Sequence, residues 1–228
     1  MLRARHAVAA LIIVAAASTP RSNILVHGAQ ETATELAAAL QRKYDGIKDF
    51  SADFTHAYEG GVLKKKITER GRLVVKKPGK MRWDYSAPEQ KQFVSDGLKM
   101  YSYIPQDKQV VVASVPENDA ATPALFLAGK GNLTRDFTAS LVDAPAGMPA
   151  GSRALKLVPK VRQAEYDSLV LVVDPATLGI RGLVTIDAQG GTSSFSFTNL
   201  QENTGVADKA FAFKIPRGVD VITAPARS

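Results

Sequence analysis

The residue types that most enzymes use for catalysis are scarce in this sequence, which limits the chemistry it can perform. The 228 residues include three histidines and no cysteine, so thiol nucleophiles, thiolate metal sites and disulfides are excluded. Two of the histidines, His6 and His27, lie in an N-terminal stretch that we expect to be removed. A Ser-His-Asp triad would therefore have to use His56, and a zinc site would hold at most one histidine. We interpret His56 as a structural or rim residue.

Other catalytic arrangements receive no support from the spacing of polar residues. The sequence has no phosphate-binding GxxxxGK[ST] loop, no GxGxxG dinucleotide motif and no GxSxG nucleophile elbow. Asp49 and Asp53 share one face of a predicted strand, but solvated carboxylates explain them more simply than a catalytic pair. The run Lys64-Lys65-Lys66 is interpreted as a solvated strand that could attract anionic groups. We therefore expect a protein that is not an enzyme and needs no metal or cofactor.

The charge of the chain points away from nucleic acid. The net charge is +7, and removal of residues 1–29 takes away three arginines and no acidic residue, which leaves +4. No basic run is interleaved with aromatic side chains that could stack on bases. Such a balance suits solubility and weak attraction to anionic surfaces.

Residues 1–29 have the features of a secretory signal peptide. Arg3 and Arg5 form a basic start, and the uncharged run from Ala7 to Ala17 is 11 residues long, too short to span a bilayer. Cleavage is expected after Ala17 or near Ala29. The rest, residues 30–228, is expected to form a single exported domain.

The elements that must position any functional residue are mostly strands. Residues 32–44 predict a helix, because Leu36, Leu40 and Tyr44 recur four residues apart and Thr32 can cap the first turn. From Phe50 onward, about ten or eleven short alternating runs follow at a spacing of roughly 8–12 residues, typical of a sandwich or barrel. Short turns join these runs, so the sheet is expected to be antiparallel. The fold class is thus mainly β, with few helices.

The stretch from Gly71 to Tyr85 predicts a hairpin with an apolar face. Two alternating runs flank a tight Pro78-Gly79 turn, and the second places Met81, Trp83 and Tyr85 on one side. Lys77 stands at the lip of that surface. The hairpin is expected to form the wall and rim of a lipid-holding cavity.

Only two small predicted helices are available to cover this large apolar sheet surface. They are the helix near Leu36 and a short apolar helix near residues 120–128, where Leu125, Phe126 and Leu127 are consecutive. The sheet must therefore close into a packed barrel or curl around something apolar, with the helices as a lid. Composition alone leaves both possibilities open.

The order and spacing of several short motifs resemble the LolA family of periplasmic lipoprotein carriers, over about residues 32–222. The motifs that carry the resemblance are Phe50-x-x-x-Phe54, Gly71-x-Leu73-x-Val75, Lys77-Pro78, Arg82-Trp83-x-Tyr85, Val94-Ser95-Asp96-Gly97, Tyr101-x-Tyr103 and Phe211-x-Phe213 with Pro216-x-Gly218-Val219. The resemblance implies an incomplete antiparallel β-barrel of about 11 strands with a helical lid over an apolar cavity.

The resemblance also implies function and partners. It implies a monomeric periplasmic carrier that takes triacylated lipoproteins from an inner-membrane ATP-driven (ABC) transporter and passes them to a LolB-like acceptor at the outer membrane. The cavity and lid residues that it implies are Leu36, Leu40, Tyr44, Phe50, Phe54, Met81, Trp83, Tyr85, Leu125, Phe126 and Leu127. In well-studied members an arginine bonds the lid backbone, and Lys77 occupies that position here, where it keeps the charge but loses the planar fork.

Three alternatives compete with the carrier. An acceptor of the LolB type is normally a lipoprotein, and this chain has no cysteine to lipidate. A regulatory sensor of the RseB type shares the half-barrel, but such sensors are expected to carry a second C-terminal domain. A hydrolase is disfavoured by the shortage of histidine and cysteine.

Overall fold

The computed structural model describes residues 31–60, 66–115, 127–129, 131–163, 166–187 and 189–224. Contacts group the chain into residues 1–30 and residues 31–228, and the second unit holds all the described helices and strands. Its helical elements are α1 (Ala33–Gly46), η1 (Pro105–Asp107), α3 (Leu133–Asp136) and η2 (Asp208–Phe211). Its strands are β1 (Asp49–Glu59), β2 (Lys66–Lys76), β3 (Lys80–Ala87), β4 (Lys91–Asp96), β5 (Lys99–Ile104), β6 (Gln109–Ser114), β7 (Phe137–Val142), β8 (Arg153–Pro159), β9 (Ser168–Val173), β10 (Ile180–Ile186), β11 (Thr192–Glu202) and β12 (Asp220–Thr223).

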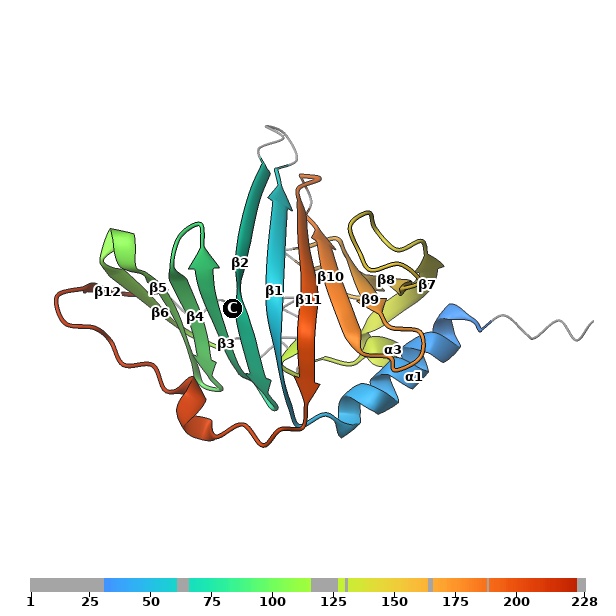
Figure 1. Cartoon of the computed structure of the whole chain (residues 1–228), viewed down its shortest axis with the longest axis horizontal. Helices are drawn as coiled ribbons and strands as arrows, with labels where there is room; N and C mark the ends of the chain where they lie inside the picture. The colour runs from blue at the N-terminus through green and yellow to red at the C-terminus, as the bar shows by residue number, and fades with distance from the viewer. Residues whose placement is uncertain are drawn as a thin grey trace, which may run out of the picture. The chain divides into compact units, whose positions relative to one another are not determined.

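One open sheet of 12 strands forms this unit, in the order β12-β6-β5-β4-β3-β2-β1-β11-β10-β9-β8-β7 (Figure 1). The sheet curves but does not close, because β12 and β7 are its two edges. The expected incomplete, mainly β barrel is confirmed. Two details differ from expectation: there are 12 strands rather than about 11, and β12 pairs with β6 in parallel, with Asp220 opposite Gln109.

The helix expected at residues 32–44 is present and starts where capping predicts. The Thr32 side chain accepts from the Glu35 amide, and the Glu35 carboxylate accepts from the Thr32 amide at 2.8 Å, which together make a capping box. The apolar stripe of α1 is buried, with Leu36 and Leu40 almost fully enclosed. The helix contacts α3, β7 and β8, so it covers one end of the sheet.

The central hairpin, β2 and β3, forms as the alternation predicts. Val75 pairs with Met81, and Leu73 pairs with Trp83 across the two strands. Gly79 in the turn has a φ of 75°, a left-handed conformation that glycine adopts without strain. We call the side of the sheet that carries Leu73 and Trp83 the inner face.

A short helix precedes β7 at a place where the sequence pattern does not predict one. The Asn132 side chain accepts from the amides of Thr134 and Arg135, which caps a single helical turn over Leu133–Asp136. The described residues contain no helix long and apolar enough to cross a membrane.

Candidate functional site

Aromatic rings gather on the inner face of the sheet and form what we call the aromatic wall: Phe54, Trp83, Tyr85, Phe93 and Phe195. The Phe54 ring lies edge-on to Trp83 at 5.1 Å and to Tyr85 at 4.8 Å, centroid to centroid. Phe195 lies 5.1 Å from Trp83, and Phe93 lies 5.6 Å from Tyr85. Because β11, β1, β2, β3 and β4 are consecutive in the sheet, rings from strands distant in sequence form one continuous apolar surface.

Most of the cavity and lid residues expected from the sequence lie in one place. Those in the buried apolar cluster are Leu36, Leu40, Tyr44, Phe50, Phe54, Met81, Trp83 and Leu127, and Tyr85 packs against it. Leu125 and Phe126 lie outside the described residues. Whether these residues bind lipid stays a prediction. Phe195 and Phe93 belong to the same surface and were not predicted; for Phe195, the alternation of polar and apolar residues in Ser193–Phe197 is the signal that could have found it.

A small pocket between α1 and the strands is lined by Leu40, Lys43, Tyr44, Ile47, Leu133, Leu171, Leu178, Ile180 and Glu202. It has room for about one water molecule. This pocket is therefore too small for a long acyl chain.

Residues 127–129 are held to the sheet and to α1 by three different contacts. The Tyr44 hydroxyl donates to the Leu127 carbonyl, and the Gly79 amide donates to the Ala128 carbonyl at 2.9 Å. Gly129 lies directly against the stem of Lys77, since a Cβ at this glycine would be 2.5 Å from Cδ of Lys77. We call α1 and residues 127–129 the lid elements.

Lys77 joins both lid elements to the hairpin. Its ammonium donates to the Tyr44 carbonyl at the C-terminal end of α1, where the helix dipole favours a cation. The same nitrogen is 3.4 Å from the centroid of the Tyr44 ring, a cation–π contact. Burial lowers the pKa of Lys77 from 10.5 to about 8, while the nearby charge of Asp45 acts in the opposite direction. The role of Lys77 as a lid latch remains a prediction.

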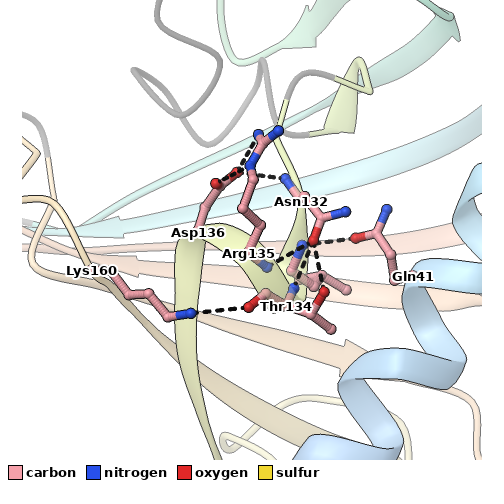
Figure 2. A network of polar contacts seen from close by, with 7 residues as sticks. Gln41, Asn132, Thr134, Arg135, Asp136 and Lys160 are labelled. Atoms are coloured by element: carbon pink, nitrogen blue, oxygen red, sulfur yellow. Dashed lines mark hydrogen bonds and ion pairs between the residues drawn. The ribbon is translucent and has the colours of Figure 1, made fainter.

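A polar network fixes α3 against α1 (Figure 2). The Leu133 amide donates to the side chain of Gln41 at 2.7 Å, which ties the first residue of α3 to α1. Lys160 donates to the Thr134 carbonyl at 3.1 Å from the strand side. Arg135 and Asp136 form a two-bond ion pair at 2.5 and 2.9 Å. These contacts make α3 a fixed support on which α1 rests.

The polar residues singled out from the sequence do not form a metal site or a carboxylate pair. Asp49 is buried and bonds Thr204 and Gly205, whereas Asp53 is exposed and pairs with Arg72. Within the described ranges, no group of three histidine, cysteine or acidic side chains could hold a metal ion. His56 contacts Glu69 and Ser193 at the far end of the aromatic wall.

Comparisons with known proteins agree with this architecture. The family model described as outer membrane lipoprotein carrier protein LolA matches residues 45–214. A protein of Methylobacillus flagellatus named outer-membrane lipoprotein carrier protein is 32% identical over 67% of this chain and 71% of its own length. One of Chromohalobacter salexigens with the same name is 31% identical over 85% of this chain and 88% of its own. An uncharacterized conserved protein of Thermus thermophilus shares the fold, with a TM-score of 0.50 at 12% identity, over 82% of this chain and 97% of its own. The chain belongs to the LolA family of outer-membrane lipoprotein carrier proteins.

Proposed function

We propose that this protein carries triacylated lipoproteins and shelters their acyl chains against the aromatic wall. The observation that supports this most directly is a broad apolar inner face, together with hydrogen bonds at Tyr44, Gly79 and Lys77 that help to hold α1 and residues 127–129 in place. Such contacts contribute only about 0.5–1.5 kcal/mol each, so they are a small part of the free energy needed to displace the cover.

The energetics of acyl chains explain why such a cover is needed. Each buried CH₂ contributes about 0.8 kcal/mol, so a protein with three acyl chains does not leave a membrane unaided. A carrier must offer equivalent apolar surface and must hide it when no cargo is bound. In the structure Phe54, Trp83, Leu36 and Leu40 are buried in one apolar cluster, which keeps these side chains out of water.

The route of the cargo follows from the carrier assignment. The carrier takes its cargo from an inner-membrane ATP-driven transporter and passes it to a LolB-like acceptor at the outer membrane. This places the protein in the periplasm, with residues 1–29 as its signal peptide and the remaining chain as one monomeric domain. No step requires catalysis, and the protein acts as a binding protein rather than an enzyme.

Release of lipoprotein from spheroplasts tests the proposal. Spheroplasts that synthesise a labelled triacylated lipoprotein are incubated with the purified protein, and the supernatant is analysed. The lipoprotein is expected to appear there in complex with the protein. Lipoprotein that stays with the membranes at every protein concentration contradicts the proposal.

Photo-crosslinking locates the acyl chains. A benzophenone amino acid replaces either Phe93, in the aromatic wall, or Leu98, which is 81% exposed on the β4–β5 hairpin. Crosslinks to the acyl chains are expected from position 93 and not from position 98. Equal crosslinking from both positions contradicts binding at the aromatic wall.

A further inference from the structure

Four polar side chains from four strands form a connected network at one end of the aromatic wall, which we call the His56 network: His56, Glu69, Lys91 and Ser193. His56 Nδ1 lies 3.0 Å from Glu69 Oε2, and His56 Nε2 lies 2.6 Å from Ser193 Oγ. Lys91 Nζ is 2.5 Å from Glu69 Oε1. The His56, Glu69 and Lys91 side chains are only 14%, 10% and 23% exposed, so the network is largely shielded from bulk water.

The network continues the apolar surface without a break. His56 follows Phe54 on the same side of β1, and its ring stacks on Phe195 at 4.2 Å and 4°. Lys91 lies opposite Tyr85 in the β3–β4 pairing, with its ammonium 4.5 Å from the Tyr85 ring centroid. Along the inner face, side chains therefore change from apolar near α1 to polar beyond Tyr85 and Phe195.

The protonation of the network follows from its burial. Burial lowers the pKa of His56 more strongly than Glu69 raises it, so the imidazole is neutral near pH 7. Burial alone would raise the pKa of Glu69, but hydrogen bonds from Lys91 and His56 outweigh it and keep the carboxylate ionised. Nδ1–H of His56 then donates to Glu69, and Nε2 accepts from the Ser193 hydroxyl. The network carries one negative and one positive charge.

Serine, histidine and a carboxylate in this order resemble a nucleophile, base and orienting acid. Acyl transfer also needs N–H donors that stabilise the oxyanion, usually the amides at or beside the nucleophile. Ser193 lies in an inner strand, paired with Tyr58 on one side and Thr185 on the other. Ser194 is likewise paired on both sides, so their amides belong to the sheet. The arrangement therefore suits binding better than catalysis.

We propose that the His56 network binds the polar junction of an acylated cargo, the ester and amide carbonyls that join the acyl chains to the protein. This inference rests on the proposed function and adds the orientation of the cargo: acyl chains along the aromatic wall, carbonyls at His56 and Lys91. Lys91 supplies the donors, because an ammonium has three N–H groups and Glu69 is the only acceptor it contacts among the described residues.

The physical reason for such a site is the cost of burying a carbonyl. A carbonyl that enters an apolar cleft without a partner loses its hydrogen bonds to water and gains nothing in return. A bond from a charged donor offsets that loss better than a bond from a neutral one. A carrier with the network should therefore distinguish ester-linked chains from plain hydrocarbon, and a carrier without it should not.

Binding of two probes by matched variants tests the inference. The probes are a synthetic triacylated lipopeptide and diphenylhexatriene, a pure hydrocarbon, and both are followed by fluorescence. The double variant Glu69→Gln/Lys91→Met removes the ion pair without leaving one charge unpaired. We expect it to bind the lipopeptide about tenfold more weakly and the hydrocarbon unchanged. Lys99→Met removes one positive charge from the exposed β4–β5 hairpin, as Lys91→Met does in the network, and should behave like the wild type.

The outcomes separate this inference from the carrier proposal. Unchanged hydrocarbon binding establishes that the double variant is folded, and Ser193→Ala gives a second, milder variant that should also weaken lipopeptide binding. Equal lipopeptide affinity in wild type and both variants would overturn the inference alone. Failure of the wild type to bind the lipopeptide would overturn the carrier proposal and the inference with it. If the wild type hydrolyses the ester of the lipopeptide and Ser193→Ala does not, the His56 network acts in catalysis, and the binding inference is overturned.

Discussion

The ammonium of Lys77 lies 3.4 Å from the ring centroid of Tyr44 and donates to the carbonyl of the same residue. One cation thus contacts both the side chain and the backbone at the end of α1. The contact fixes where α1 sits, but the half-buried charge has lost much of its hydration. Burial accordingly lowers the pKa of Lys77 to about 8. The lysine therefore positions the lid element without locking it.

Opening of the lid should become harder as the pH rises above 8. In the closed arrangement the pKa of Lys77 is about 8, and in an open, solvated arrangement it returns to 10.5. Between these two pH values the open form binds more protons, so a rise in pH favours the closed form by up to about tenfold per pH unit. Uptake of an apolar dye, followed through Trp83 fluorescence, should fall over this range and be constant below pH 7.

Two substitutions at Lys77 separate charge from shape. Lys77→Leu removes the poorly hydrated charge, so the lid should favour the closed form at all pH values, and cargo transfer should slow. Lys77→Arg keeps a charge that does not titrate below pH 12, so the change between pH 8 and 10.5 should disappear. Transfer kinetics in Lys77→Leu that match the wild type would show that the Lys77 charge does not influence opening of the lid.

The Tyr44 hydroxyl should stabilise the closed arrangement through Leu127. The hydroxyl is buried and donates to the Leu127 carbonyl, and burial raises the pKa of Tyr44 well above its usual value, so it stays protonated. Tyr44→Phe leaves that carbonyl without this donor and should lower the free energy of unfolding by about 1–2 kcal/mol, measured by urea denaturation. Tyr58→Phe, at a side chain that is 37% exposed, should change it by less than about 0.5 kcal/mol. Equal effects of the two substitutions would show that the Leu127 contact contributes nothing.

Local patterns predict the elements of this fold but not all of their partners. Alternation predicts the hairpin with Met81 and Trp83 on one face, and the Thr32–Glu35 capping box predicts the start of α1. The parallel pairing of Val221 with Val110 could not be predicted, because the two segments are far apart in sequence and a four-residue strand has little periodicity.

The same contrast between local patterns and distant partners applies to the candidate site. The expected cavity residues on β1 and β3 share a face that alternation reveals, so their common cluster could be predicted. The His56 network could not, because it depends on which strands are neighbours and in which register. His56 faces Glu69 only through the β1–β2 pairing, and Ser193 is within reach only because β11 returns beside β1. A sequence with a single histidine outside residues 1–29 indicates which residue to examine, but not its partners.

The Asp49 carboxylate should be a major anchor of the segment that follows β11. Asp49 is 4% exposed and accepts from the Thr204 amide at 2.8 Å, the Thr204 hydroxyl at 3.1 Å and the Gly205 amide at 3.1 Å. Asp49→Ala removes all three bonds and should lower the free energy of unfolding by about 3 kcal/mol. Asp53→Ala, on the same strand, removes only exposed contacts and should cost much less, because water screens them. Comparable losses in the two variants would contradict the anchoring role.

Gly71 is required because β3 lies too close to β2 at this position to admit a side chain. A Cβ at this position would lie 2.1 Å from the Asp84 carbonyl oxygen and 2.7 Å from Cζ of Phe54, so both the neighbouring strand and the aromatic wall would have to shift. Gly71→Ala should therefore destabilise the protein by about 3 kcal/mol, a fall in melting temperature of roughly 6–12 °C.

Gly46 provides the matched control for that substitution. A Cβ at Gly46, at the end of α1, would meet nothing within 4 Å. Gly46→Ala should thus be neutral or raise stability by up to about 1 kcal/mol, because alanine loses less conformational entropy on folding. The Trp83 emission spectrum should change in Gly71→Ala, where the Phe54 ring is displaced, and not in Gly46→Ala. A Gly71→Ala variant that keeps the wild-type melting temperature and Trp83 emission would show that β2 and β3 can separate freely at this point.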